Sequence, residues 1–131
     1  VVSSSLGPSW RRRLAAAYDQ ALAGLAPLVR APAGQPGVNP CRHLMNVAID
    51  FDAAGVSRAE VMGRLKDRGV GSQVHYIPVP DQPYYRARRG AIDLPGAQAY
   101  YARTLSLPLH PAMGVSDVDR VVSALGEALT P

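Results

Sequence analysis

Apolar residues recur at three- and four-residue spacing near the start of the chain. Such a stripe predicts a helix over Ser9–Leu25. Its members are Trp10, Leu14, Tyr18, Leu22 and Leu25. Ser9 can cap the start of this helix, and Pro27 prevents its continuation. Arg11–Arg13 lie in the first turn, where the helix dipole favours anions, so they indicate a solvated surface or a contact with a group outside the chain.

Alternation of apolar and polar residues predicts three strands. The first covers residues 44–51 and follows a Pro/Gly-rich loop at residues 31–40. The second covers Val70–Ile77. The third is short, covers Leu105–Leu109, and contains Pro108, which places it at a sheet edge because proline cannot donate to the ladder.

Capping signals predict two of the remaining helices. Ser57 and Glu60 form a capping box that opens a helix ending at Arg68, and Gly69 follows in the C′ position. Ser116 and Asp119 are expected to cap the last helix. The apolar face of that helix consists of Val118, Val121, Val122, Leu125 and Leu129.

A further helix is predicted over Pro95–Thr104, because proline is tolerated in a first turn. Between the second strand and this helix, Pro78, Pro80 and Pro83 predict extended or turn conformations. The resulting order of elements predicts an α+β fold with a small, mostly antiparallel sheet and helices packed on it. At 131 residues the chain has room for one domain, spanning residues 1–131.

Composition narrows the function classes. No window reaches the ~18 consecutive apolar residues of a membrane span. The single cysteine, Cys41, excludes an internal disulfide and suits a reducing compartment, so a cytoplasmic protein is expected. A packed or idle thiol is favoured over a nucleophile for Cys41. The net charge is +4, but the basic residues are spread along the chain, which disfavours nucleic-acid binding.

Several catalytic signatures are absent from the sequence. It contains no Walker or Rossmann glycine loop and no Gly-x-Ser-x-Gly elbow. His43, His75 and His110 are too far apart in sequence to show a metal-ligand spacing, so no metal site is predicted.

Candidate chemistry is concentrated in residues 74–89, VHYIPVPDQPYYRARR. This run holds one histidine, three tyrosines, three prolines and three arginines. Histidine can donate or accept at neutral pH, tyrosines offer stacking faces, and arginines suit phosphate. Loops that follow strands often carry binding groups. The alternative is structural: Tyr76, Tyr84 and Tyr85 would cover a small core while the arginines face solvent.

Three runs of sequence carry a family resemblance: GVGSQVHYIPVPDQPYYR, DLPGAQAYYARTLSLPLHPAM and SDVDRVVSAL. Together with RRRLAAAYDQALAGL and RHLMNVAIDF, they resemble the C-terminal region of the DegT/DnrJ/EryC1/StrS aminotransferases, from about Trp10 to Leu129. These are PLP-dependent enzymes that aminate nucleotide-linked keto-sugars. The resemblance implies the small C-terminal domain of a fold-type-I (aspartate aminotransferase-like) enzyme, whose large PLP-binding domain is absent from these residues.

The resemblance also implies site residues and partners. His75 and Tyr76 match a pair that lines the substrate side of the family's active site. Tyr84 and Tyr85 match the QPYY motif, with a weaker substrate-proximal role, and Arg42 and His43 match a conspicuous family position. The implied partners are a UDP-linked 4-keto-6-deoxy sugar, an amino-acid donor such as glutamate, and a second subunit of a homodimer. The HYIPV…QPYYR run most resembles the branch that makes 4-amino-4,6-dideoxy sugars on the pathway to pseudaminic acid.

Lys66 is the only lysine among the 14 basic residues. It lies off the apolar face of its helix, so a solvated side chain is favoured over a Schiff-base role, which requires burial. The chain alone is therefore expected to be inactive, with PLP bound by the large domain. Apolar surface that packs on that domain should then be exposed. A competing interpretation is a stand-alone, non-catalytic α+β ligand-binding or regulatory module.

Overall fold

The computed structural model describes residues 8–131, so the first seven residues of the predicted domain lie outside the described range. The elements are, in chain order, α1 (Pro8–Leu22), the 3-10 turn η1 (Ala23–Leu25), β1 (Val29–Arg30), β2 (Met45–Ile49), α2 (Phe51–Ala54), α3 (Arg58–Asp67), η2 (Val79–Asp81), α4 (Pro83–Arg89), α5 (Pro95–Arg103), β3 (Thr104–Leu107) and α6 (Val115–Ala128). Within that range, no helix is both long and apolar enough to cross a bilayer.

The three strands form one antiparallel sheet in the order β1-β2-β3. The alternation predicted for β2 is confirmed, because Met45, Val47 and Ile49 are buried while Asn46 and Ala48 are only partly buried. β3 is an edge strand of this sheet, as predicted, but it ends at Leu107 and Pro108 follows it instead of lying within it. The α+β class with an antiparallel sheet is confirmed.

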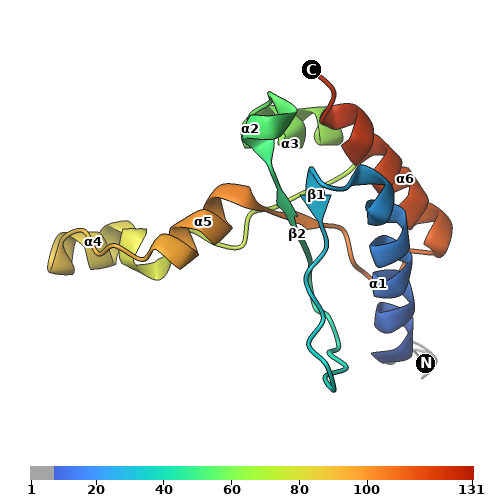
Figure 1. Ribbon diagram of the computed structural model, residues 1–131, viewed down its shortest axis with the longest axis horizontal. Helices are drawn as coiled ribbons and strands as arrows, with labels where there is room; N and C mark the ends of the chain where they lie inside the picture. Colours follow the sequence, from blue (N-terminus) through green and yellow to red (C-terminus); the bar gives the residue numbers. More distant parts are fainter. Residues whose placement is uncertain (1–7) are drawn as a thin grey trace.

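One face of the sheet is covered by α1 and α6, which lie side by side, with α3 packed beside α6 (Figure 1). Leu105 of β3 and Leu125 of α6 are fully buried in the core between them. Burying such a leucine contributes roughly 1.5–3 kcal/mol through removal of apolar surface from water. All five residues predicted for the inward face of the last helix are buried.

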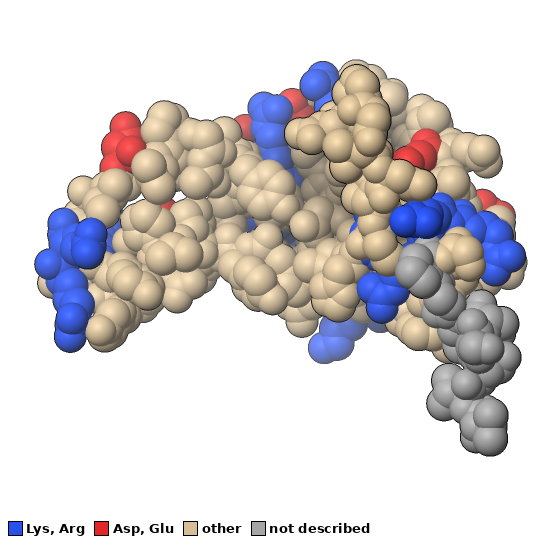
Figure 2. All heavy atoms as spheres, turned by 90° about the horizontal axis from the view of Figure 1, so that it is seen from below, with Lys and Arg blue, Asp and Glu red and all other residues tan. Residues whose placement is uncertain are grey.

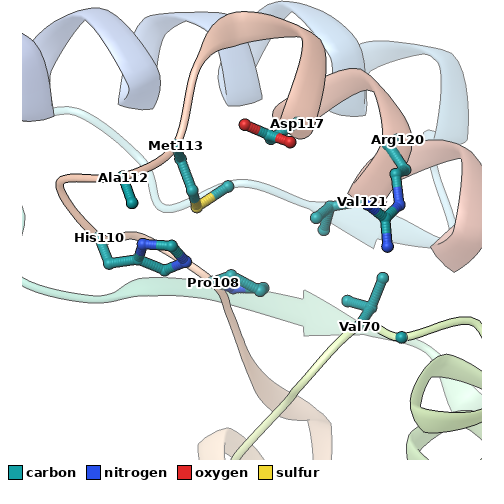
Figure 3. Close-up of a pocket in the computed structure, with 9 residues that line it drawn as sticks. Val70, Pro108, His110, Ala112, Met113, Asp117, Arg120 and Val121 are labelled. Carbon is teal, nitrogen blue, oxygen red and sulfur yellow. The ribbon is translucent and has the colours of Figure 1, made fainter.

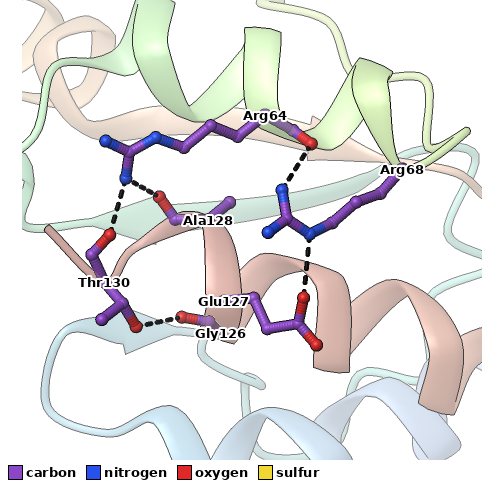
Figure 4. Close-up of polar contacts among 6 residues, drawn as sticks. All are labelled: Arg64, Arg68, Gly126, Glu127, Ala128 and Thr130. Carbon is purple, nitrogen blue, oxygen red and sulfur yellow. Dashed lines mark hydrogen bonds and ion pairs between the residues drawn. The ribbon is translucent and has the colours of Figure 1, made fainter.

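Arginines of α3 fasten that helix to the end of α6 (Figure 4). Arg64 donates to the carbonyl oxygens of Ala128 at 3.0 Å and Thr130 at 2.6 Å. Arg68 pairs with Glu127 at 2.9 Å. The last carbonyls of a helix have no partner within the helix, so Arg64 satisfies one of them at Ala128, and both cations are electrostatically favoured at this end.

The predicted strand over Val70–Ile77 is wrong. Only Gln73 pairs with β3, through Gln73 N to Ser106 O at 3.2 Å and Ser106 N to Gln73 O at 2.7 Å. After this bridge the chain leaves the sheet, and no further residue up to Ile77 pairs with β3. An alternating pattern does not by itself produce a strand, because the residues also need backbone partners. The edge strand β3 offers such a partner only to Gln73.

The extended or turn conformation expected after Ile77 is also wrong for Pro83–Arg89, which form α4. Pro83 occupies the first position of the helix, where its missing N–H is not needed. Gly90 ends α4 with φ +72°. A proline at N1 with a glycine seven residues later was the available signal for this helix.

Smaller differences concern the ends of elements. Asp50 ends β2 and caps α2 by accepting from Ala53 N at 3.1 Å, so Phe51 belongs to a helix and not to the strand. The first turn of α6 is held by Asp117, whose carboxylate accepts from Gly114 N at 2.8 Å, instead of by the predicted Ser116–Asp119 pair. Ser9 lies inside α1. The capping box of Ser57 and Glu60 is confirmed.

Residues 76–103 form an arm that extends away from the body and carries η2, α4 and α5 (Figure 1). Its base is anchored by Arg58, which donates to Tyr101 O and lies over the Tyr101 ring at 4.6 Å. Basic side chains gather at its tip, while most of the visible underside is uncharged (Figure 2). Large apolar side chains that are exposed on the arm are Tyr76, Ile77, Val79, Tyr84, Tyr85, Ile92, Leu94 and Tyr100.

Candidate functional site

A continuous chain of side-chain hydrogen bonds crosses the sheet face opposite α1 and α6. Nδ1 of His75 lies 2.7 Å from Oγ of Ser106. The Ser106 hydroxyl donates to Oδ1 of Asn46 at 2.6 Å, and Nδ2 of Asn46 donates to the Tyr100 hydroxyl at 3.1 Å. We call these four residues the polar relay. It links the segment after α3, strands β2 and β3, and α5.

Strand register places the middle of the polar relay. Asn46 of β2 and Ser106 of β3 are direct partners across the antiparallel ladder, so their side chains share one face at short separation. The backbone bridge between Gln73 and Ser106 holds the segment that carries His75 beside the same strand. The backbone bridge at Gln73 therefore places His75 within hydrogen-bonding distance of Ser106.

Two hollows lie on either side of the polar relay. One, of about 450 Å³, is lined by His75 and Ser106 together with Gln73 and the backbone around Gly71. The other, of about 540 Å³, is lined by Asn46 and Tyr100 together with residues that include Arg30, Pro32, Pro40 and Arg42. Each is large enough for part of a sugar nucleotide, within the lower range of small-molecule pockets.

His75 and Tyr76 lie edge to face, with ring centroids 4.6 Å apart and an interplanar angle of 88°. His75 is half-buried against Ser106, whereas Tyr76 is 70% exposed. The pair thus presents one fixed imidazole and one free phenol at the junction between the body and the arm, so both predicted residues stand at the polar relay.

Arg42 and His43 are placed differently. Arg42 pairs with Asp19 of α1 at 3.0 Å, and Nδ1 of His43 lies 3.2 Å from Nη1 of Arg11. Both residues therefore connect the loop before β2 to α1. The contact with His43 also explains the position of Arg11, one of the three arginines predicted in the first turn of α1. Arg42 also lines the 540 Å³ hollow beside Asn46, whereas His43 is exposed.

Tyr84 and Tyr85 lie on α4, in the arm, and not beside His75. Their rings are 5.1 Å apart at 90°, and Arg88 lies over the Tyr84 ring at 4.6 Å. They are 59% and 42% exposed, so they do not cover the core of the described residues. Of the six residues singled out from sequence, the structure brings only His75 and Tyr76 to the polar relay.

Sequence reasoning missed Asn46, Ser106 and Tyr100 as site residues. Asn46 and Ser106 were recognisable as the polar positions of two alternating strands. Nothing local showed that these strands pair with Asn46 opposite Ser106, or that α5 places Tyr100 over them.

A third, smaller pocket of about 180 Å³ lies at the start of α6 (Figure 3). His110 and Met113 point toward it from the loop after β3, and Asp117 and Arg120 border it from α6. The Asp117 carboxylate is occupied in holding Gly114 N, so this pocket is explained by the capping of α6.

Comparisons with known proteins place this fold. The chain is 46% identical over 86 residues to the spore coat polysaccharide biosynthesis protein SpsC of Bacillus subtilis (strain 168), a match that covers 63% of this chain and 22% of SpsC. Among solved structures, DesI in the presence of its TDP-sugar product is 32% identical, with a TM-score of 0.83 over 94% of this chain and 31% of DesI.

Helicobacter pylori PseC, an aminotransferase involved in the biosynthesis of pseudoaminic acid, has the same fold. Its TM-score is 0.83 at 20% identity, over 93% of this chain and 32% of PseC. The chain thus spans less than a third of the length of these three proteins. The aminotransferase fold implied by the sequence runs is confirmed for the part of the chain that the structure describes.

The DegT/DnrJ/EryC1/StrS aminotransferase family matches residues 8–126, which is nearly the whole chain. This match includes both strands of the polar relay, the His75–Tyr76 pair and the arm. The chain belongs to the DegT/DnrJ/EryC1/StrS aminotransferase family.

Proposed function

We propose that this chain forms the sugar-nucleotide side of a PLP-dependent aminotransferase, acting on a nucleotide-linked 4-keto-6-deoxy sugar with glutamate as the amino donor. The observation that carries this proposal is the pair His75–Tyr76, held by Ser106 beside an open hollow in a chain of this family. A fixed imidazole suits the recognition of a hydroxyl group, and a free phenol can donate to a phosphate oxygen.

PLP supplies the electron sink that lets an amino group move between two carbon skeletons. Structures with this fold include a PLP form and a PMP form of one sugar aminotransferase. The residues described here do not fit the covalent attachment of PLP, because Lys66 is exposed near the end of α3. We therefore assign PLP and its lysine to a large domain outside residues 1–131, and the complete site to a homodimer.

The chain's own residues would bind and orient the substrate. His75 and Tyr76 would contact the sugar or its diphosphate and would not carry protons in the reaction. Arg42, at the rim of the 540 Å³ hollow, is a candidate for the diphosphate, although its pairing with Asp19 must then be shared or broken. Tyr84, Tyr85 and His43 would act only where the arm and loop meet another part of the enzyme.

The arm supports a larger assembly. Its exposed apolar side chains include Ile77, Val79, Ile92 and Leu94, none of which packs on the body. Contiguous exposed apolar surface marks a region that another surface covers. We propose that the PLP-binding domain or the second subunit covers the arm, and that the isolated chain self-associates through it.

The identity of the nucleotide and of the sugar is the most specific part of the proposal. The sequence runs favour UDP and the branch of the pseudaminic acid pathway, whereas DesI was solved with a TDP-sugar. Both nucleotides share the diphosphate that this site would recognise, so the test compares them directly.

The test measures binding of a UDP-sugar and of a TDP-sugar to the 131-residue chain by saturation-transfer NMR. We expect contact with one of them, lost in His75→Ala and weakened in Tyr76→Phe. Tyr101→Phe is the matched control, because Tyr101 stacks on Arg58 away from the polar relay. Equal contact in wild type and His75→Ala, or no contact with either sugar nucleotide, contradicts the assigned role.

In a protein where these residues are joined to their PLP-binding domain, His75→Ala with Tyr76→Phe should raise KM for the sugar and leave the glutamate half-reaction unchanged. Loss of the glutamate half-reaction would show that the pair acts on the cofactor side instead. The coding sequence upstream of Val1 gives a separate check, since a lysine-bearing large domain there supports the proposal over the stand-alone module.

A further inference from the structure

The polar relay determines where the imidazole of His75 carries its proton. The hydroxyl of Ser106 has one hydrogen and two neighbours, Oδ1 of Asn46 and Nδ1 of His75. A carbonyl oxygen can only accept, so the hydroxyl hydrogen must point to Asn46. Ser106 can then only accept from His75, which requires a hydrogen on Nδ1.

This reasoning depends on which way the Asn46 amide points, and the distances decide it. The separation between Asn46 and Ser106 is 2.6 Å, which suits O–H···O (roughly 2.5–3.0 Å) and is too short for N–H···O (roughly 2.7–3.2 Å). The separation between Asn46 and Tyr100 is 3.1 Å, which suits N–H···O and is long for O–H···O. The carbonyl of the amide therefore faces Ser106, and its NH₂ faces Tyr100.

The other ring nitrogen of His75 is left for a ligand. Within residues 8–131, Nε2 of His75 has no hydrogen-bond partner, and the side chain borders the 450 Å³ hollow. With the hydrogen on Nδ1, neutral His75 presents Nε2 as a lone pair. Such a nitrogen accepts a hydrogen bond from a hydroxyl and gives nothing to a carbonyl or phosphate oxygen.

We propose that Asn46 and Ser106 are positioning residues that hold His75 in the Nδ1–H tautomer, so that Nε2 accepts a hydrogen bond from a sugar hydroxyl. The ligand role rests on the proposed function, whereas the tautomer does not. Tyr100 takes part by anchoring the NH₂ of the Asn46 amide. The neutral side chain of a histidine in water prefers its hydrogen on Nε2, so the protein reverses the intrinsic preference.

The test is the tautomeric state of His75 in the 131-residue chain, read from the ¹⁵N shifts of its two ring nitrogens at about pH 9, where an ordinary imidazole is neutral. The signals are assigned by their loss in His75→Ala. We expect Nδ1–H to predominate in the wild type. A predominantly Nε2–H imidazole overturns the proposal.

Two substitutions at one position give the matched comparison. Asn46→Ala removes the acceptor, which frees the Ser106 hydroxyl to donate to Nδ1, so His75 should change to the Nε2–H form. Asn46→Asp keeps an acceptor facing Ser106, so the Nδ1–H form should persist. Retention of Nδ1–H in Asn46→Ala would show that Asn46 does not set the tautomer.

Thr104→Val controls for removal of a buried polar group from the same sheet face. Thr104 lies two residues before Ser106 on β3, and its hydroxyl has no hydrogen-bond partner among residues 8–131. This variant should keep Nδ1–H, and a change of tautomer in it would count against the specific role of Asn46. If Asn46→Ala does not fold, Ser106→Ala should likewise abolish the preference for Nδ1–H.

The proposed hydrogen bond from a sugar hydroxyl to Nε2 of His75 is tested by adding the sugar nucleotide that the chain binds. Thr104→Val, which leaves the polar relay intact, should retain its saturation transfer, and Asn46→Ala should lose it. If the tautomers behave as stated and no sugar nucleotide binds even to the wild type, the proposed function fails while the positioning of His75 stands. If both variants bind equally, the tautomer does not serve substrate recognition.

Discussion

Tyr18 offers a sharp test of how α1 is joined to the strand that carries Ser106. Its side chain is fully buried in the core, and its hydroxyl donates to the carbonyl oxygen of Pro108 at 2.7 Å. Pro108 directly follows β3 and borders both the 450 Å³ hollow and the pocket at α6. Tyr18→Phe removes this hydrogen bond with almost no change in volume.

The expected loss of stability follows from the partner left behind. A net hydrogen bond contributes about 0.5–1.5 kcal/mol, and a buried acceptor left unpaired costs about 1–3 kcal/mol. Pro108 is only partly buried, so water can reach its carbonyl in part. We therefore expect Tyr18→Phe to lower the free energy of unfolding by about 1–2 kcal/mol, measured by urea titration near pH 8.

The same variant should alter the alkaline end of the stability curve. Burial, and then the negative charge of Asp117, raise the pKa of Tyr18 well above its usual range. The unfolded chain releases this proton at about pH 10 while the folded chain keeps it, so folding loses stability as the pH rises. The slope reaches at most about 1.4 kcal/mol per pH unit for one group.

Tyr18→Phe lacks this loss of stability at alkaline pH, because it has no hydroxyl to titrate. The two proteins should therefore differ below about pH 10 and converge between about pH 10 and 11.5. The measurement is the difference between their urea midpoints across this range, which cancels the titration of the exposed tyrosines. Equal stabilities near pH 8, or a difference that stays constant into the alkaline range, would refute the buried hydrogen bond.

Four further substitutions test the packing and capping described above, by the same urea titration. Thr104→Val should raise stability by about 1 kcal/mol, because it removes a buried hydroxyl that has no partner in the described residues; a loss would reveal a partner for that hydroxyl. Ser57→Ala should cost about 1 kcal/mol, since Ser57 accepts from Glu60 N, whereas Ser116→Ala, at a position that caps nothing, should cost little. Equal costs would contradict the observed caps. Leu125→Ala should cost about 2–5 kcal/mol, as the side chain is fully buried.

The capping box also predicts acid behaviour. Hydrogen bonds from Ser57 lower the pKa of Glu60 below its usual value. The contribution of the Glu60 carboxylate to folding stability is therefore present above the ordinary glutamate pKa of about 4.3 and is lost as the pH falls through the lowered pKa. The stability difference between wild type and Ser57→Ala should shrink in that acid range, and a difference that grows there would be inconsistent with the box.

Where neighbouring residues decide a structure, the sequence was sufficient. The capping box of Ser57 and Glu60 needs only two residues three positions apart, and β2 and α6 bury the faces that their periodicity indicated. The family was also readable from the sequence, because its motifs are contiguous runs. Each of these features depends on chemistry within one element.

Tertiary structure decided the rest. The alternation over Val70–Ile77 resembled a strand, yet only Gln73 finds a partner on β3. The proline-rich run contained a helix that begins at Pro83 and projects from the body (Figure 1). Its tyrosines, Tyr84 and Tyr85, are exposed. Whether such a segment pairs, folds back or extends depends on what surface lies beside it, which periodicity does not record.

The polar relay shows this division most clearly. The sequence indicated His75 by its residue type and its neighbours, but not the hydroxyl and amide that orient its ring. Asn46 lies 54 residues before Tyr100 and 60 before Ser106, and it meets them only through the register of β2 and β3 and the packing of α5. Sequence alone fixed which side chains were present; the pairing of two strands decided which nitrogen of His75 is free for a ligand.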